Sequence, residues 1–201
     1  IESPGRRFFT MIGTLVQGRV SLDGAAVAAS KMALKTAIQY GTERRQFNAA
    51  SDIREEVLMD YQQHQRRLLP LLATTYAASF AHDELLAKFD DVFSGADDTD
   101  ENRQDLETLA AALKSLSTWH ALDTLQECRE ATGGAGFLAE NRLTALRSDL
   151  DIYVTFEGDN TVLLQLVAKR LLADYAKEFQ GADFGVLARY VVGQATERTF
   201  H

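Results

Sequence analysis

The sequence predicts an all-α protein whose long helices pack as an up-down-up-down four-helix bundle with an extra C-terminal helix. Only two of the 201 residues are proline. Long stretches consist of Ala, Leu, Glu, Gln and Arg, which favour helix. Apolar residues in these stretches recur at helical intervals. Long helices joined by short loops pack most economically as such a bundle.

The first helix is expected over residues 7–40, a range without proline. Its apolar residues recur at intervals of three, four and seven, as one face of a helix requires. These residues are Met11, Leu15, Leu22, Ala29 and Met32. The range forms either one long helix or two helices joined near Gly24.

A second long helix is expected after a break at residues 41–48, and Ser51 with Glu55 marks its start. Its apolar positions are spaced by three or four throughout. They are Ile53, Val57, Tyr61, His64, Leu68, Leu72, Tyr76 and Phe80. Pro70 should bend this helix, because proline removes a backbone hydrogen bond.

A third helix follows the acidic loop at residues 94–100 and reaches about Glu130. Its predicted face carries Leu106, Leu109, Leu113, Leu116 and His120. Residues 131–150 lack a regular pattern, apart from a short helical piece near residues 143–148. The fourth helix is expected over residues 160–177.

An amphipathic segment at residues 184–197 comes after the fourth helix. We therefore assign residues 1–178 to the bundle and residues 179–201 to an additional helical segment that begins a further helical region. The chain starts with Ile1 rather than Met, so we expect a piece of a longer polypeptide.

Composition argues against several classes of protein. The net charge of −8 argues against a nucleic-acid partner, since such proteins usually present a basic surface. No apolar run approaches the roughly 18 residues that span a bilayer, so we predict no membrane span and a cytosolic protein. The histidines lack paired metal-ligand spacing, so we predict no metal site. Cys128, the single cysteine, is interpreted as a small buried hydrophobe.

Glu157 is the candidate for acid–base chemistry. It stands between Phe156 and Gly158, just before the fourth helix. Phe156 places apolar surface beside the carboxylate, and Gly158 lets a substrate approach the backbone, features that favour a general base. The alternative is a polar turn at residues 157–160 that only caps the next helix.

Glycines gather at residues 132–137, and residues 134–139 match a loose dinucleotide-binding fingerprint. That fingerprint requires a preceding apolar strand, whereas a charged helix leads into this cluster. We therefore reject a Rossmann fold. The cluster is a helix C-cap with a tight turn, and it could also expose backbone against which a cofactor lies.

Arg44 and Arg45 precede Phe47 at the end of the first helix. Two guanidinium groups beside an aromatic ring suit a pyrophosphate joined to a flat ring system. The alternative is a solvated basic turn, favourably placed at a helix C-terminus. Arg19 falls within the apolar face of the first helix, where it needs an anionic partner unless it reaches back to the surface.

Three runs, taken together, resemble the C-terminal helical region of the acyl-CoA dehydrogenase and acyl-CoA oxidase superfamily. They are residues 13–20 (GTLVQGRV), 128–137 (CREATGGAGF) and 156–162 (FEGDNTV). They look closest to acyl-CoA oxidases and their bacterial relatives. The resemblance covers most of the chain, and it implies that the N-terminal helical domain and the β-domain of the family are absent from it.

The resemblance implies an FAD-dependent oxidoreductase of fatty acid β-oxidation that converts a fatty acyl-CoA to the trans-2-enoyl-CoA. Glu157 matches the family's catalytic base, which takes the α proton while the β hydrogen leaves as hydride to the flavin. Oxygen or an electron-transfer flavoprotein would then reoxidise the flavin. The family forms homodimers or homotetramers with FAD at the subunit interface. The location would be cytoplasmic for a bacterial protein and peroxisomal for a eukaryotic one.

The same resemblance assigns further site residues. Arg44 matches an arginine that reaches the FAD pyrophosphate of a neighbouring subunit, and Phe47 matches an aromatic residue that packs on that cofactor. Gly133 and Gly134 match glycines over which the partner's cofactor lies.

Asp159 and Asn160 match positions that touch flavin. Arg19, Phe156 and Gly158 match the active-site wall.

Two positions depart from the family pattern: Glu130 replaces a frequent glutamine, and Asn48 replaces a usual glycine. Because two domains of the family are missing, we expect the chain alone neither to retain FAD nor to turn over substrate. A different class of function stays open, in which the chain is a non-catalytic helical bundle for oligomerisation or protein binding.

Overall fold

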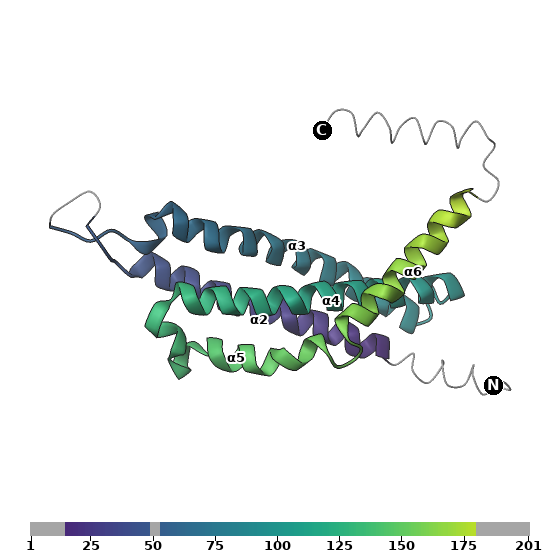
Figure 1. Ribbon diagram of the computed structural model, residues 1–201. Helices are drawn as coiled ribbons and strands as arrows, with labels where there is room; N and C mark the ends of the chain where they lie inside the picture. Colours follow the sequence, from purple (N-terminus) through teal and green to yellow (C-terminus); the bar gives the residue numbers. More distant parts are fainter. Residues whose placement is uncertain (1–14, 49–52, 180–201) are drawn as a thin grey trace, which may run out of the picture.

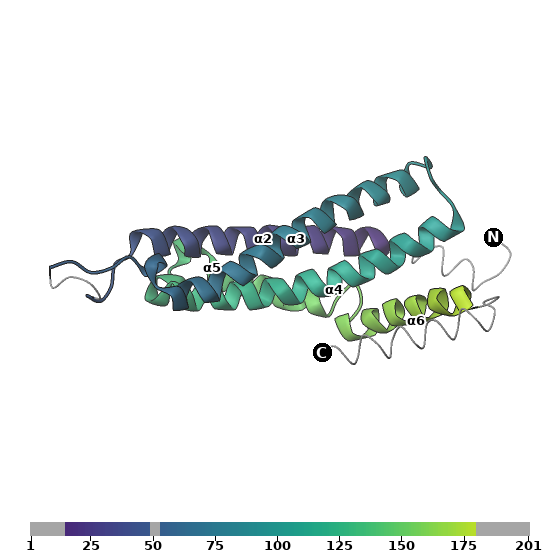
Figure 2. The same ribbon diagram turned by 90° about the horizontal axis from the view of Figure 1, so that it is seen from above.

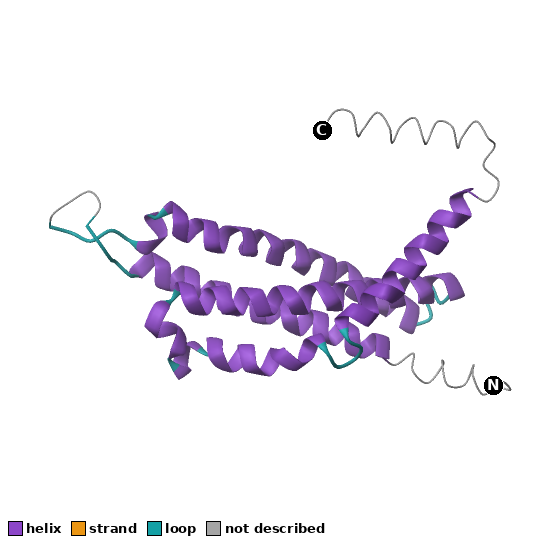
Figure 3. Ribbon diagram, viewed as in Figure 1, coloured by secondary structure: helices purple, strands orange, loops and turns teal. Residues whose placement is uncertain are grey.

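The computed structural model describes residues 15–48 and 53–179, and the elements in these ranges are helical (Figures 1 and 3). The α-helices are α2 (Leu15–Glu43), α3 (Gln62–Phe93), α4 (Asp100–Ala131), α5 (Leu143–Leu150) and α6 (Asn160–Phe179). Short 3-10 helices are η1 (Leu58–Asp60), η2 (Gly133–Phe137), η3 (Ala139–Asn141) and η4 (Asp151–Val154). The predicted all-α class is confirmed. The segment at residues 184–197 lies outside the described residues.

Helix α4 is the centre of the bundle and packs against α2, α3, α5 and α6. Helices α2, α3 and α4 lie side by side along most of their length, whereas α5 lies beside α4 and α6 crosses α4 at a steep angle to α5 (Figure 1). Helix α6 packs mainly on α4 and points away from the other helices beyond that contact (Figure 1). The chain passes from α5 through η4 and a short loop into α6, and this loop carries Glu157.

The third and fourth predicted helices agree with α4 and α6, and the first agrees with α2 from residue 15 on, while residues 7–14 of that prediction lie outside the described residues. Helix α2 continues through Gly24 as one helix. A Cβ atom at Gly24 would lie 2.7 Å from Cε1 of His82, so the glycine lets α3 approach α2 closely. Helix α3 also continues through Pro70, which is exposed.

The predicted start of the second helix was wrong. Residues 53–57 are not helical, and Ile53 is 96% exposed. Instead, Gln46 N–H donates to the carbonyl of Glu56, and Leu58 N–H donates to the carbonyl of Arg44. These bonds pair residues 44–47 with residues 56–58, so backbone groups of these two segments find partners without a helix.

The predicted faces of α3 and α4 are right in part, because His64, Leu68 and Leu106 are buried. Tyr76 and Phe80 on α3 and Leu116 on α4 are exposed. Small side chains fill much of the interface between α2 and α4 instead. The buried residues on these two helices in this cluster are Ala26, Ala29, Ala33, Leu34, Ala37, Ala121, Leu125, Cys128 and Ala131. Short side chains let the helix axes lie close together. None of the described helices is long and apolar enough to cross a membrane.

Candidate functional site

The loop between η4 and α6 holds Glu157 in a left-handed backbone conformation. Its φ is 55°, and Gly158 follows with φ 105°. A non-glycine residue with positive φ is uncommon and clusters at functional sites. A Cβ atom at Gly158 would lie 2.8 Å from Cδ2 of Leu163, so the turn requires glycine there. These two residues stop the chain from continuing as helix and redirect it into α6.

The carboxylate of Glu157 lies against Gly18 of α2. A Cβ atom at Gly18 would be 2.7 Å from Cδ of Glu157 and within 3.0 Å of both carboxylate oxygens. Oε2 of Glu157 is buried and accepts no hydrogen bond from the described residues. No described residue accepts a hydrogen bond from the backbone N–H of Glu157. A buried acceptor without a donor is costly, so its presence needs an explanation beyond the fold.

Arg19 holds the same loop from α2. The side chain is buried, and its Nε donates to the backbone carbonyl of Glu157 at 3.2 Å. Its Nη1 lies 3.8 Å from Oε1 of Glu107, so Arg19 has an anionic partner of the expected kind. Burial lowers the pKa of Arg19, while the nearby charges of Glu107 and Glu157 oppose that shift. Arg19 therefore connects α2, α4 and the Glu157 loop.

Lys114 of α4 is a site residue that the sequence analysis did not find. Its side chain is fully buried, and Nζ donates to the carbonyl of Gly158 at 2.7 Å and to Oδ1 of Asn160 at 2.8 Å. One sequence signal could have found it. Lys114 lies four residues after Ala110, which is itself four after Leu106, so a charged residue occupies the buried face of α4.

Asp159 and Asn160 have structural contacts within the chain. Oδ1 of Asp159 accepts hydrogen bonds from the backbone N–H groups of Thr161 and Val162, so Asp159 caps α6. Asn160 is 1% exposed, and its amide donates to the carbonyl of Ser115 and the hydroxyl of Thr118. The alternative interpretation of residues 157–160 was a turn that caps the next helix. Such a turn is present next to Glu157, and Asp159 forms the cap.

Arg44, Phe47, Gly133 and Gly134 lie at the other end of the bundle, where α2 and α4 both end (Figures 1 and 2). Arg44 is exposed, and Phe47 has φ 63° and is 67% exposed. A Cβ atom at either glycine would meet nothing within 4 Å, so the backbone there is open. An exposed guanidinium, an exposed ring and open backbone fit the pyrophosphate and ring system of FAD.

These two groups of residues are far apart. Gly18 and Arg44 are separated by 26 positions along α2 and its C-terminal end. At about 1.5 Å per residue, that separation is on the order of 40 Å. The group of residues around Glu157 and the group around Arg44 therefore lie at opposite ends of the bundle. They do not contact one another within this chain.

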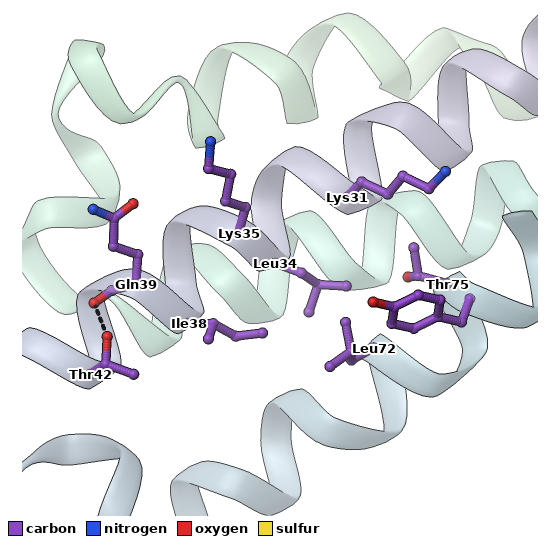
Figure 4. Close-up of a pocket in the computed structure, with 9 residues that line it drawn as sticks. Lys31, Leu34, Lys35, Ile38, Gln39, Thr42, Leu72 and Thr75 are labelled. Atoms are coloured by element: carbon purple, nitrogen blue, oxygen red, sulfur yellow. Dashed lines mark hydrogen bonds between the residues drawn. The ribbon is translucent and has the colours of Figure 1, made fainter.

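A groove of about 500 Å³ lies between α2 and α3 (Figure 4). Its residues are Lys31, Leu34, Lys35, Ile38, Gln39, Thr42, Leu72, Thr75 and Tyr76. None of the predicted site residues lines it. Within the described ranges, no cluster of three or more His, Cys, Asp or Glu side chains could hold a metal ion.

The family model described as acyl-CoA oxidase, C-alpha1 domain, matches residues 12–172. The chain is 43% identical over 175 residues to putative acyl-coenzyme A oxidase 3.2, peroxisomal, of Arabidopsis thaliana, covering 87% of this chain and 25% of that protein. It is 38% identical over 174 residues to peroxisomal acyl-coenzyme A oxidase 3 of Homo sapiens, covering 83% of this chain and 25% of that protein.

Solved structures agree with these matches. The crystal structure of acyl-CoA oxidase 1 from Yarrowia lipolytica superposes with a TM-score of 0.78 at 30% identity, covering 87% of this chain and 28% of that one. Acyl-CoA oxidase-1 of Caenorhabditis elegans, complexed with FAD and ATP, has a TM-score of 0.73 at 28% identity, covering 86% of this chain and 27% of that one.

The chain spans about a quarter of the length of these relatives. The relatives named here are eukaryotic, and two are named as peroxisomal, so the expectation of a bacterial cytoplasmic protein finds no support. A family match over residues 12–172 and 43% identity to an acyl-CoA oxidase agree with the motifs around Arg19, Gly133 and Glu157. The chain belongs to the acyl-CoA oxidase family, in which it matches the C-alpha1 domain.

Proposed function

We propose that this chain supplies the catalytic base of a flavin-dependent fatty acyl-CoA oxidase, and that the base is Glu157. The reaction is the α,β-dehydrogenation of a fatty acyl-CoA to the trans-2-enoyl-CoA. One observation carries the proposal. The Glu157 carboxylate is fixed in a left-handed turn against Gly18, and its buried Oε2 has no hydrogen-bond donor among the described residues.

An unpaired carboxylate oxygen is suited to accept a proton from a substrate. The α proton of a thioester becomes acidic when donors stabilise the negative charge that develops on the carbonyl oxygen. The backbone N–H of Glu157 has no acceptor among the described residues, so it can donate to that oxygen. Glu157 would then remove the proton with its side chain and stabilise the resulting charge with its backbone.

Phe156, Gly158 and Arg19 form the surroundings of the base. The ring of Phe156 lies 5.3 Å from the ring of Tyr153, so aromatic surface flanks the turn. Phe156 is 40% exposed, so its ring offers apolar surface that a bound acyl chain would cover. Arg19 fixes the Glu157 carbonyl from behind the turn.

The residues that would hold FAD are Arg44, Phe47, Gly133 and Gly134, with the exposed Asp159 nearer the base. The amide of Asn160 is buried and already paired within the chain, so Asn160 would support this end of the site without offering its side chain to the flavin. Bound FAD supplies the acceptor for the hydride that leaves the β carbon. Because Arg44 and Glu157 lie at opposite ends of the bundle, we propose that they serve different cofactors, with Arg44 reaching the FAD of a neighbouring subunit. This arrangement requires a homodimer or homotetramer.

We propose oxygen as the electron acceptor, because the relatives are named as oxidases, and hydrogen peroxide would be the second product. The names of the Arabidopsis and human relatives favour the peroxisome as the location. The 19% identical electron transferring flavoprotein of Acidaminococcus fermentans shares the fold alone.

The test is Glu157→Gln in the full-length protein that contains this chain. The substitution keeps the shape of the side chain and removes its basicity, so the rate of flavin reduction by an acyl-CoA should fall by roughly 10²- to 10⁴-fold with FAD still bound. Glu140→Gln is a matched control, because Glu140 is exposed in η3. An unchanged rate in Glu157→Gln would favour the non-catalytic bundle instead.

A further inference from the structure

Lys114 is a buried cation without a carboxylate partner within hydrogen-bond distance in the part of the chain that the structure describes. It is 0% exposed, although lysine is almost never fully buried unless it is paired. Both of its acceptors, the Gly158 carbonyl and the Asn160 amide oxygen, are neutral. Burying a charge beside neutral acceptors costs free energy, so stability does not explain why a lysine occupies this position.

The environment of Lys114 shows this cost. Burial lowers its pKa to about 8, and the positive charge of Arg19 adds to the lowering. The carboxylates of Asp159 and Glu157 act in the opposite direction, because they favour the charged ammonium. The compensating charges of Lys114 therefore belong to the candidate base and its neighbour in the same loop.

We propose that Lys114 is a positioning residue for Glu157, which it serves by fixing the Gly158 carbonyl against α4. This inference rests on the proposed function and adds to it a residue on a third helix. Arg19 of α2 donates to the carbonyl of Glu157, and Lys114 donates to the next carbonyl along the chain. Two cations from two helices thus hold two successive peptide groups.

The turn needs this support because of its backbone. Gly158 has no Cβ and populates positive and negative φ about equally, so its observed φ of 105° is not enforced by the residue itself. The carbonyl that Lys114 binds belongs to the peptide group between Gly158 and Asp159, so rotation about the permissive Gly158 would break this hydrogen bond and shift the turn that carries Glu157. Hydrogen bonds from an ammonium group are charge-assisted and stronger than neutral ones. Lys114 therefore selects one conformation of a permissive turn.

Asn160 extends the same support into α6. Its Oδ1 accepts from Lys114, while its Nδ2 donates to the carbonyl of Ser115 and to the hydroxyl of Thr118. The first residue of α6 is thereby tied to the middle of α4. The loop that carries Glu157 is consequently fixed on both sides, by Arg19 at its start and by Lys114 with Asn160 at its end.

The experiment compares Lys114→Met with Lys169→Met in the full-length protein. Methionine keeps the length of the lysine stem and removes the donors, and Lys169 is an exposed lysine of α6 that serves as the matched control. We expect kcat with a fatty acyl-CoA to fall by about 10- to 100-fold in Lys114→Met, because a displacement of roughly 1 Å costs this much. KM and the FAD content should be retained, as for a loss made in the transition state.

Hydrogen exchange supplies a readout that does not depend on catalysis. Amides of residues 156–160 should exchange faster in Lys114→Met and at the wild-type rate in Lys169→Met. A folded Lys114→Met protein with wild-type kcat would overturn the proposal, as would loss of FAD and of kcat together. If Lys114→Met does not fold, Lys114→Gln decides, since its shorter side chain cannot reach both acceptors. Wild-type kcat in that variant would also overturn the proposal.

Glu157→Gln, measured in parallel, separates the two levels of inference. Full activity in Glu157→Gln would refute the proposed function, while hydrogen exchange would still report whether Lys114 holds the turn. Loss of activity in Glu157→Gln with wild-type kcat in folded Lys114→Met would refute only the role of Lys114.

Discussion

Replacing Gly18 by alanine should slow catalysis with little effect on folding. The new Cβ atom would lie 2.7 Å from Cδ of Glu157. Non-bonded carbon atoms are optimally about 3.5–4.0 Å apart, so the carboxylate must retreat by roughly 1 Å. Misplacement of a reacting group by about 1 Å costs on the order of 10²-fold in rate, or about 2.7 kcal/mol of transition-state stabilisation.

The stability of Gly18→Ala is the sum of two opposing effects. Alanine in a helix interior is favoured over glycine by about 1 kcal/mol. Crowding against Glu157 costs about 1–3 kcal/mol. The free energy of unfolding should therefore fall by no more than about 2 kcal/mol, so a large loss of rate would report the position of the carboxylate rather than loss of fold.

Stopped-flow measurement of flavin reduction by an acyl-CoA, in the full-length protein, is the assay. Gly24→Ala is the matched control, because the same substitution in the same helix creates a 2.7 Å contact with His82 instead of Glu157. We expect the rate to fall in Gly18→Ala and to be retained in Gly24→Ala. Flavin reduction at the wild-type rate in folded Gly18→Ala would refute the view that the Glu157 carboxylate must lie against Gly18.

Two further predictions concern titratable groups. Because burial lowers the pKa of Lys114 to about 8 from 10.5, Lys114 contributes stability that is present above pH 10.5 and lost as the pH falls through about 8. The free energy of unfolding of this chain minus that of Lys114→Met should thus increase as the pH rises from about 8 to 10.5. A difference that stays flat or falls over this range, measured by urea titration, would contradict the lowered pKa of Lys114. Burial also raises the pKa of the Cys128 thiol to about 12. A disulfide reagent at pH 8 should therefore label this single cysteine only after unfolding. Rapid labelling of the folded chain would show that the thiol is accessible and would contradict this prediction.

The sequence was sufficient for the helices and for Glu157 as the candidate base. Helical periodicity and the rarity of proline depend on residues near one another in the chain, and α2, α4 and α6 follow these patterns. Glu157 could be found because an acid beside a glycine before a helix is a local feature, strengthened by the order of three motifs.

Local patterns determined only part of the buried side of α3 and α4. Leu116 matched the predicted face of α4 but is exposed, whereas Lys114 is buried on the same helix. The start of α3 was also missed, because pairing between Arg44 and Leu58 satisfies the backbone of that loop. In each case the deciding contact comes from a segment that is distant in sequence.

The sequence by itself determined that the chain is helical and carries an acid in a glycine-containing turn. Only the tertiary structure placed Gly18 beneath the Glu157 carboxylate and Lys114 on the carbonyl of Gly158. Those contacts join residues 139 and 44 positions apart, so no periodicity or spacing encodes them. They form because α2, α4 and the loop before α6 meet at one point of the bundle, where a missing side chain makes room for the acid and a buried ammonium fixes its turn.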